Sequence, residues 1–246
     1  MEFAQPTFWK SAGSYDTLIF LEDEIRTVEI IHGRFCSSGR SGKEFRSRTL
    51  LLATGVVDIL PKIDGLEKLF GKSAHHCPYC HGWECRGQPL AVLGSDRAAA
   101  DLALELLLWS RDIVLCTQGC PVEKKLQAGL EARGILIEST PIRRCESEAD
   151  QLTGIRFEDD GWLARSALFF SPQQAQKSEL AEELGCKRRE GCCLRCADDG
   201  GTHIRGLFLA GNASEGVQLA ITAAAKGTMA AKAINELLLT EDGLTL

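Results

Sequence analysis

Short apolar runs separated by polar turns mark the first quarter of the chain. Apolar residues group at Thr17–Leu21 and at Ile25–Phe35, and a polar turn follows at Ser37–Gly42. A further run, Arg48–Ala53, stops at Thr54-Gly55. Runs of this length, bounded by serine and glycine, are typical of β-strands. The first quarter is therefore expected to be rich in strands.

From Pro89 the pattern changes to alternating strands and helices. Pro89–Leu93 and Asp112–Cys116 are continuous apolar runs, and the intervening Asp96–Ser110 has apolar residues at helical spacing. A second helix is predicted at Lys124–Arg133, followed by a third strand at Ile135–Glu138. Strands that alternate with helices favour a parallel sheet with right-handed crossovers.

The remainder of the chain is predicted to return to strands and to end in a helix. Further elements are expected at Gly154–Glu158, Trp162–Arg165 and Ala167–Phe170 (strands), Ser178–Leu184 (short helix) and Leu207–Ala210 (strand). The turn Gly211-Asn212 then precedes a long Ala-rich helix from about Gly216 to Leu239. The fold class indicated by the whole pattern is α/β.

Composition excludes some functions. The chain has 246 residues, of which 44% are hydrophobic and 25% charged, and its net charge is −6. This length suits one large domain or two ordinary ones. The acidic balance argues against general nucleic-acid binding, and no apolar run approaches the roughly 18–20 residues of a membrane-spanning helix. Because the first residues do not resemble a signal peptide, we expect a cytoplasmic protein without membrane or nucleic-acid partners.

Eleven cysteines direct attention to thiol chemistry. An odd number of cysteines without an export signal indicates reduced thiols, among which a special pair performs redox or metal chemistry. The segment Cys77-Pro78-Tyr79-Cys80 places two thiols three residues apart. Such a pair can close a disulfide ring at a helix start, where free N–H groups favour the thiolate.

The histidines around this pair supply proton donors and acceptors. His81 follows Cys80 directly, and His75 and His76 precede Cys77. A zinc site is the first alternative, but it needs two further ligands, and no second Cys-x-x-Cys at suitable spacing accompanies Cys77 and Cys80. Two simply packed thiols are the other alternative. We favour a redox-active pair and expect no metal.

Two glycine-containing turns are weaker candidates. Gly94-Ser95-Asp96-Arg97-Ala98-Ala99 lies between a strand and a helix, where a dinucleotide pyrophosphate binds, but Asp96 occupies the place of the second glycine. Gly211-Asn212, with Gln218, joins a strand to a helix of small residues that can approach a flat ring closely. An ordinary strand–helix turn and a simple packing helix are the respective alternatives.

A second group of cysteines lies near the C-terminus. Cys186, Cys192, Cys193 and Cys196 fall within eleven residues. They suit either a zinc site or a hairpin with incidental cysteines. We favour the hairpin, because the adjacent Cys192 and Cys193 do not easily point at one ion.

Four segments together resemble the low-molecular-weight thioredoxin reductase family. They are Leu50–Asp58, His76–Glu84, Pro89–Ala99 and Gly206–Ala231, and their order and spacing resemble its thioredoxin-reductase-like branch, which includes dithiol oxidases of the gliotoxin and holomycin pathways. The resemblance implies a flavoenzyme in which NADPH or NADH reduces FAD and the flavin exchanges electrons with Cys77 and Cys80. It also implies a homodimer that acts on a small-molecule dithiol or disulfide, or on a thioredoxin-like protein.

The resemblance assigns roles to single residues. Cys80 would face the flavin, Cys77 would attack or resolve the external disulfide, and His81 would protonate the leaving thiolate. The FAD-contacting positions fall on Thr54, Gly55, Gly211, Asn212 and Gln218. Gly94, Ser95 and Arg97 fall in the nicotinamide turn.

The sequence also departs from this family. Its glycine-rich FAD fingerprint has no counterpart here, since the likeness starts near Tyr15. Asn212 replaces an Asp, Asp96 interrupts the nicotinamide turn, and Thr117-Gln118-Gly119 lacks the arginines that recognise a 2′-phosphate. We therefore expect FAD to bind weakly or not at all.

The resemblance implies two Rossmann-like nucleotide-binding domains. An incomplete FAD-type domain would combine residues 1–72 and 195–246, and an NAD(P)-type domain, residues 73–194, would carry the cysteine pair. This arrangement requires Leu207–Leu239 to pack against Leu50–Thr54. The expected function is that of a pyridine nucleotide–disulfide oxidoreductase. The alternative is a shortened, non-catalytic relative that acts as a thiol-bearing binding or regulatory protein.

Overall fold

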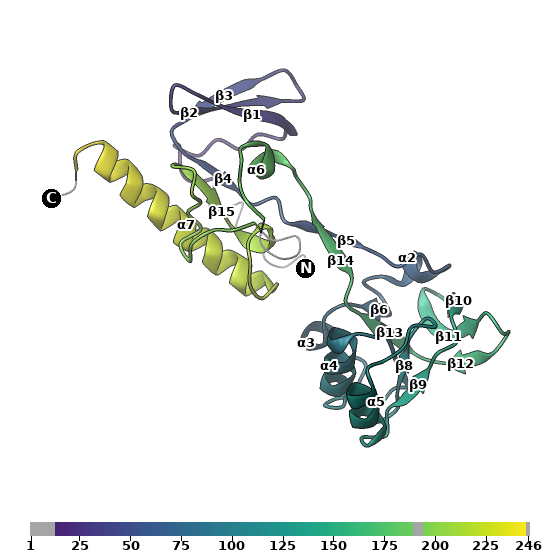
Figure 1. The fold of residues 1–246 in the computed structure, drawn as a ribbon. Helices are drawn as coiled ribbons and strands as arrows, with labels where there is room; N and C mark the ends of the chain where they lie inside the picture. Colours follow the sequence, from purple (N-terminus) through teal and green to yellow (C-terminus); the bar gives the residue numbers. More distant parts are fainter. Residues whose placement is uncertain (1–12, 189–193, 245–246) are drawn as a thin grey trace. The chain divides into compact units, whose positions relative to one another are not determined.

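The structure, a computed structural model, describes residues 13–188 and 194–244 (Figure 1). The described residues fall into two compact units. Asp58–Ala175 form one, which we call the inserted unit, and the residues up to Val57 and from Gln176 onward form the other, the split unit. The chain crosses between them through β5 (Val56–Ile59) and β14 (Gln173–Gln176), which pair in a two-stranded sheet.

A parallel sheet of five strands forms the centre of the inserted unit. Its order is β6 (Ala74–His75), β13 (Ala167–Phe170), β7 (Leu90–Leu93), β8 (Ile113–Cys116) and β9 (Leu136–Glu138). The helices α4 (Arg97–Leu106) and α5 (Lys124–Glu131) connect β7 to β8 and β8 to β9. The predicted α/β class and the alternation of strands and helices are thus confirmed.

Both faces of this sheet are covered, which explains the continuous apolar runs. Every residue of β7, β8 and β13 is buried. Leu90 and Val92 point to the face packed by α4 and α5, whereas Ala91 and Leu93 point to the opposite face. That opposite face is covered by α2 (Leu66–Leu69) and by an antiparallel sheet of β10 (Ile142–Glu148), β11 (Gln151–Phe157) and β12 (Trp162–Ala164).

The split unit contains smaller sheets. The antiparallel strands β1 (Ile25–Ile31), β2 (Arg34–Gly39) and β3 (Glu44–Ser47) form one sheet, and the parallel strands β4 (Leu50–Leu52) and β15 (Leu207–Leu209) form another. Its helices are α6 (Leu180–Glu183), the 3₁₀ turn η1 (Gly211–Ala213) and α7 (Ala220–Glu241). The pairing of β4 with β15 confirms the predicted contact between these two distant segments.

Two predicted elements of the split unit differ from the structure. The run Ile25–Phe35 is not one strand, because His32 and Gly33 adopt positive φ angles of 50° and 72° and turn the chain between β1 and β2. The run Thr17–Leu21 forms no strand, and Ile19 is 80% exposed. Apolar runs predict strands only where a neighbouring element buries them.

No helix in the part of the chain that the structure describes is long and apolar enough to cross a membrane.

Candidate functional site

The Cys77–Cys80 segment forms a short helical turn at the edge of the inserted unit. Helix α3 (Pro78–His81) begins after Cys77, which has an extended backbone, and Pro78 occupies its first position. The Gly82 N–H closes the turn on the carbonyl oxygen of Pro78 at 2.7 Å. A Cβ on Gly82 would lie 2.5 Å from Cδ2 of Trp109. Glycine at this position therefore lets Trp109 pack directly against the turn.

The two thiols of this turn interact with each other. Cys80 is exposed, Cys77 is half-buried, and both are free cysteines. The Cys80 thiol donates a hydrogen bond to the Cys77 sulfur, and this bond, followed by burial and the charge of Cys77, raises the pKa of Cys80 to about 11. The expected lowering of a thiol pKa at the helix start is therefore not found at Cys80, where the hydrogen bond with Cys77 is the largest cause. Such a pair loses its protons in succession.

Two histidine rings stack beside the thiols. The centroids of the His75 and His81 rings are 4.0 Å apart, and the ring planes differ by 15°. Phe169 of β13 packs on His75 at 5.4 Å. The Nδ1 atoms of His75 and His81 are both buried and have no hydrogen-bond partner among the described residues. Burial, then the charges of His81 and His76, lowers the pKa of His75 to about 4.

Sequence reasoning identified His81 as a proton carrier and His75 only as its neighbour. The stack was missed because it joins the β6 strand to a turn that begins two residues later. His75 ends the edge strand β6 and is buried, whereas His76, which follows the strand, is exposed.

The nicotinamide turn has the predicted strand–helix geometry but not a phosphate site. Gly94 has a φ of 141°, and a Cβ there would lie 2.6 Å from Cβ of Ala99, so the turn requires glycine. The Oδ1 atom of Asp96 accepts the Ala99 N–H at 2.9 Å and caps α4. Arg97 bonds to Asp101 at 2.8 Å. A carboxylate holds the amide that a pyrophosphate needs, so these residues do not fit that group.

The predicted FAD-contacting residues of the split unit come together at one sheet edge. Thr54 and Gly55 follow the end of β4, and Gly211 and Asn212 follow the end of β15. Because β4 and β15 are parallel, their carboxyl ends meet at the same edge, where ligands of such sheets bind. A Cβ on Gly55 would meet no atom within 4 Å, which leaves its backbone open to a ligand.

A lysine that the sequence did not single out holds this edge in place. Lys226 of α7 donates hydrogen bonds to the carbonyl oxygens of Gly211, at 3.2 Å, and Ser214, at 3.3 Å, and also to that of Glu215. Gln218 is half-buried nearby in the sequence. The glycine backbones and neutral side chains of this edge fit the uncharged parts of FAD. The charged Lys226 is already bound to carbonyl groups.

The chain pairs on either side of the second cysteine group, and the turn of the predicted hairpin lies outside the described residues. Arg188 pairs with Leu194, and the Arg195 N–H donates to the carbonyl oxygen of Lys187 at 3.0 Å. Cys186 is buried and Cys196 is half-buried, whereas Cys192 and Cys193 lie outside the described residues. Within 13–188 and 194–244, no three His, Cys, Asp or Glu side chains are grouped as a metal site requires.

Comparisons with known proteins identify the family. The pattern of the pyridine nucleotide-disulphide oxidoreductase family matches residues 10–227. The chain is 28% identical over 210 residues to thioredoxin reductase sirT of Leptosphaeria maculans, covering 79% of the chain and 64% of that protein. It is 28% identical over 209 residues to thioredoxin reductase tcpT of Claviceps purpurea, covering 80% of the chain and 65% of that protein.

Solved structures agree with this assignment. The crystal structure of HlmI is 32% identical, with a TM-score of 0.91, and the match covers 97% of this chain and 76% of that one. A putative thioredoxin reductase TrxB from Bacillus anthracis is 26% identical, with a TM-score of 0.88 and coverage of 96% and 82%. The chain spans slightly less than two thirds of the two fungal relatives. It belongs to the pyridine nucleotide-disulphide oxidoreductase family, in the thioredoxin-reductase-like branch.

Proposed function

We propose that this chain is a thioredoxin-reductase-like disulfide oxidoreductase whose reversible dithiol is Cys77–Cys80. The observation that carries the proposal is the hydrogen-bonded thiol pair on one turn of helix, with Cys80 exposed. Two sulfurs that already contact each other can form a disulfide with little backbone movement. The names of the fungal relatives support the same chemistry.

Cys77, Cys80 and His81 each have one role in the exchange reaction. The Cys77 thiolate attacks one sulfur of an external disulfide, which breaks the substrate S–S bond and leaves a mixed disulfide. His81 gives a proton to the departing thiolate. The Cys80 thiolate then attacks the Cys77 sulfur, so the second substrate thiol leaves and the Cys77–Cys80 disulfide forms. The substrate gains two electrons, and the reverse sequence oxidises a dithiol.

The flavin edge of the split unit would complete this function. When bound, FAD supplies the two-electron exchange with the dithiol. Thr54, Gly55 and Gly211 would hold it through backbone groups, and Asn212 and Gln218 through their amides. We expect weak binding, because these residues bring no free cation to the pyrophosphate. The nicotinamide turn does not fit NADPH or NADH, since the Asp96 carboxylate accepts the Ala99 N–H that a pyrophosphate would need.

The remaining assignments belong to the same proposal. The split unit would be the FAD-type domain and the inserted unit the NAD(P)-type domain. The substrate would be a small-molecule dithiol or disulfide, or a thioredoxin-like protein, and the protein would act in the cytoplasm. Exposed apolar side chains of the split unit, including those of Ile19 (80%) and Ile221 (76%), favour a homodimer. A stable monomer in sedimentation would contradict the dimer.

The decisive experiment measures thiol–disulfide exchange with a small aromatic disulfide that releases a coloured thiolate. The dithiol-reduced chain should release two equivalents of thiolate and form the Cys77–Cys80 disulfide, found by peptide mapping. Cys80→Ser should release one equivalent at this site and retain the mixed disulfide on Cys77. Cys120→Ser is the matched control, because Cys120 is also an exposed thiol of the inserted unit. Absence of the Cys77–Cys80 disulfide in Cys120→Ser, or absence of the mixed disulfide on Cys77 in Cys80→Ser, would contradict the proposal.

A further inference from the structure

The His75–His81 stack has a property that the exchange reaction alone does not require. His75 is 4% exposed, and its ring lies between His81 on one side and Phe169 on the other. The His75 ring has a hydrogen bond with the backbone of Lys72, but its buried Nδ1 has no partner among the described residues, which is unfavourable. Because the ring stacks on His81, position 75 requires a histidine or another flat side chain.

Stacking limits the charge that the two rings can carry. Two imidazolium ions with centroids 4.0 Å apart would repel each other, so at most one of them is protonated at neutral pH. The groups whose charges act on His75 are His81 and His76, which disfavour its protonation, and Glu84, which favours it. The neighbouring β13 contributes Phe169, which is uncharged. The buried His75 therefore stays neutral.

The position of His81 connects the stack to the thiols. Cys77 is the residue before the first residue of α3 and His81 is its last residue, so one helical turn separates them. The Nδ1 atom of His81 is buried although the side chain as a whole is only half-buried. Proton exchange with solvent or with a thiol is thus left to Nε2.

We propose that His75 is a positioning residue whose neutral ring holds His81 in place, so that His81 serves as the single proton carrier for Cys77. This inference rests on the proposed role of the Cys77–Cys80 pair. The flat face of His75 fixes the plane of the His81 ring. Its neutrality keeps a second positive charge away from the stacked His81 ring.

The test compares the pH dependence of Cys77 alkylation by iodoacetamide in four forms of the full chain, using peptide mass spectrometry. His81→Gln removes the proton carrier, His75→Leu removes the flat ring, and His75→Phe keeps a flat, neutral ring. Wild type and His75→Phe should share one profile. His75→Leu should follow His81→Gln, with a change of about threefold or more near pH 7, which corresponds to half a unit of thiol pKa. Cys120 alkylation in the same samples should not change.

A profile for His75→Leu that superimposes on that of wild type would overturn the inference. So would a loss of the wild-type profile in His75→Phe with the fold retained. If His75→Leu does not fold, proton NMR of the wild-type imidazoles decides: the His75 ring should remain neutral down to pH 5, and protonation of His75 above pH 5 would overturn the inference. Alkylation and NMR need neither flavin nor disulfide substrate, so failure of the exchange assay remains distinguishable from failure of this inference.

Discussion

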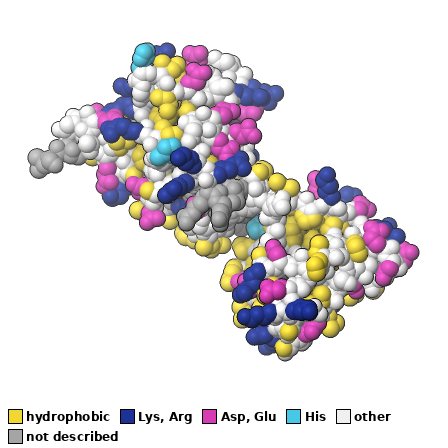
Figure 2. Space-filling view, viewed as in Figure 1, with side chains coloured by type: hydrophobic (Ala, Val, Ile, Leu, Met, Phe, Trp, Pro, Cys, Tyr) yellow, Lys and Arg dark blue, Asp and Glu magenta, His cyan; other side chains and the backbone are white. Residues whose placement is uncertain are grey.

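The inserted unit and the split unit show how differently two parts of one chain support their candidate sites. The thiol turn of the inserted unit stands next to a parallel sheet that is covered on both faces. The flavin edge of the split unit stands on a parallel sheet of two strands, and apolar side chains lie exposed on this unit. Figure 2 shows hydrophobic side chains, in yellow, on the visible surface of both units.

The comparison separates the chemistry that each unit can perform by itself. The dithiol needs only the α3 turn, the two histidines and Trp109, all of which belong to the inserted unit. The flavin edge needs two loops from segments more than 150 residues apart, joined by the three residue pairs of β4 and β15. We therefore expect perturbations of the split unit to change cofactor binding and to leave disulfide formation unaffected.

The largest expected effect concerns which cysteines pair. Under mild oxidation Cys77 and Cys80 should form a disulfide before any pair within the Cys186–Cys196 group, because Cys80 is exposed whereas Cys186 is buried. Differential alkylation with peptide mapping measures the order. Cys80→Ser should stop disulfide exchange at the mixed disulfide on Cys77 and so abolish turnover, and Cys186→Ser should leave turnover largely unchanged. Free Cys77 and Cys80 under conditions that oxidise the others would refute the redox assignment.

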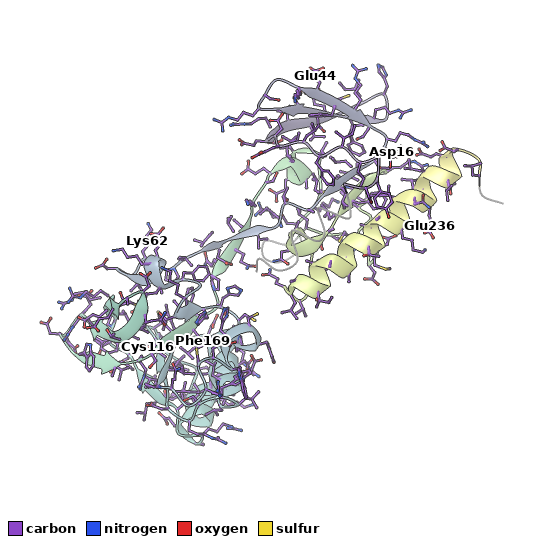
Figure 3. All side chains as sticks on the ribbon, turned by 180° about the vertical axis from the view of Figure 1, so that it is seen from behind. Asp16, Glu44, Lys62, Cys116, Phe169 and Glu236 are labelled. Carbon is purple, nitrogen blue, oxygen red and sulfur yellow. The ribbon has the colours of Figure 1, made fainter. Side chains whose placement is uncertain are left out.

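The second prediction tests the core of the inserted unit. Phe169, marked in Figure 3, is fully buried and also supports the His75 ring. Phe169→Ala should lower the free energy of unfolding of this unit by about 3–5 kcal/mol, because it leaves a cavity. Leu209→Ala, also at a buried position, is the matched change in the split unit. Urea unfolding followed by hydrogen exchange should show that Phe169→Ala lowers the protection of the inserted unit alone and Leu209→Ala that of the split unit alone. Equal loss of protection in both units would contradict independent units.

The third prediction uses the pKa of His75, which is lowered from 6.5 to about 4. Between these values an unfolded chain binds a proton that the folded chain does not, so folded-state stability falls as pH decreases from about 6.5 to 4. The full difference amounts to about 3 kcal/mol. His75→Phe should remove this part of the pH dependence. Urea midpoints of wild type and His75→Phe, measured from pH 7 to pH 4, should diverge; parallel curves would contradict a buried neutral His75.

The fold of the inserted unit was largely predictable because its signals are local. The apolar runs at β7, β8 and β13 follow from strands buried on both faces, and the helices between them have their own periodicity. The break at His32-Gly33 was less visible, since it depends on two positive φ angles inside an apolar run. Turn chemistry there overrides the strand pattern.

The candidate sites were predictable only where adjacent residues define them. Cys77, Cys80 and His81 lie in one short segment that the sequence identifies. Asp96 was identified because it stands where a dinucleotide-binding turn has a glycine. The stacking of His75 on His81 depends on how β6 enters the sheet, and the bonds of Lys226 depend on how α7 packs over the Gly211 loop. Contacts of this kind join elements whose relative position no local pattern encodes.

The smallest expected effect concerns the Asp96 cap. Asp96→Ala removes the hydrogen bond to the Ala99 N–H and should lower the free energy of unfolding of the inserted unit by about 1 kcal/mol. The same change removes a negative charge and frees an amide at the start of α4, so affinity for a reduced nicotinamide dinucleotide should rise. Asp101→Ala is the control, since it alters an exposed pair with Arg97 on the same helix and should change stability less. Urea unfolding and fluorescence titration with NADH measure the two quantities. If Asp96→Ala loses the cap but binds NADH no better than wild type, the carboxylate is not what makes this turn unsuited to a pyrophosphate. The poor fit of the inserted unit to a dinucleotide would then need another cause.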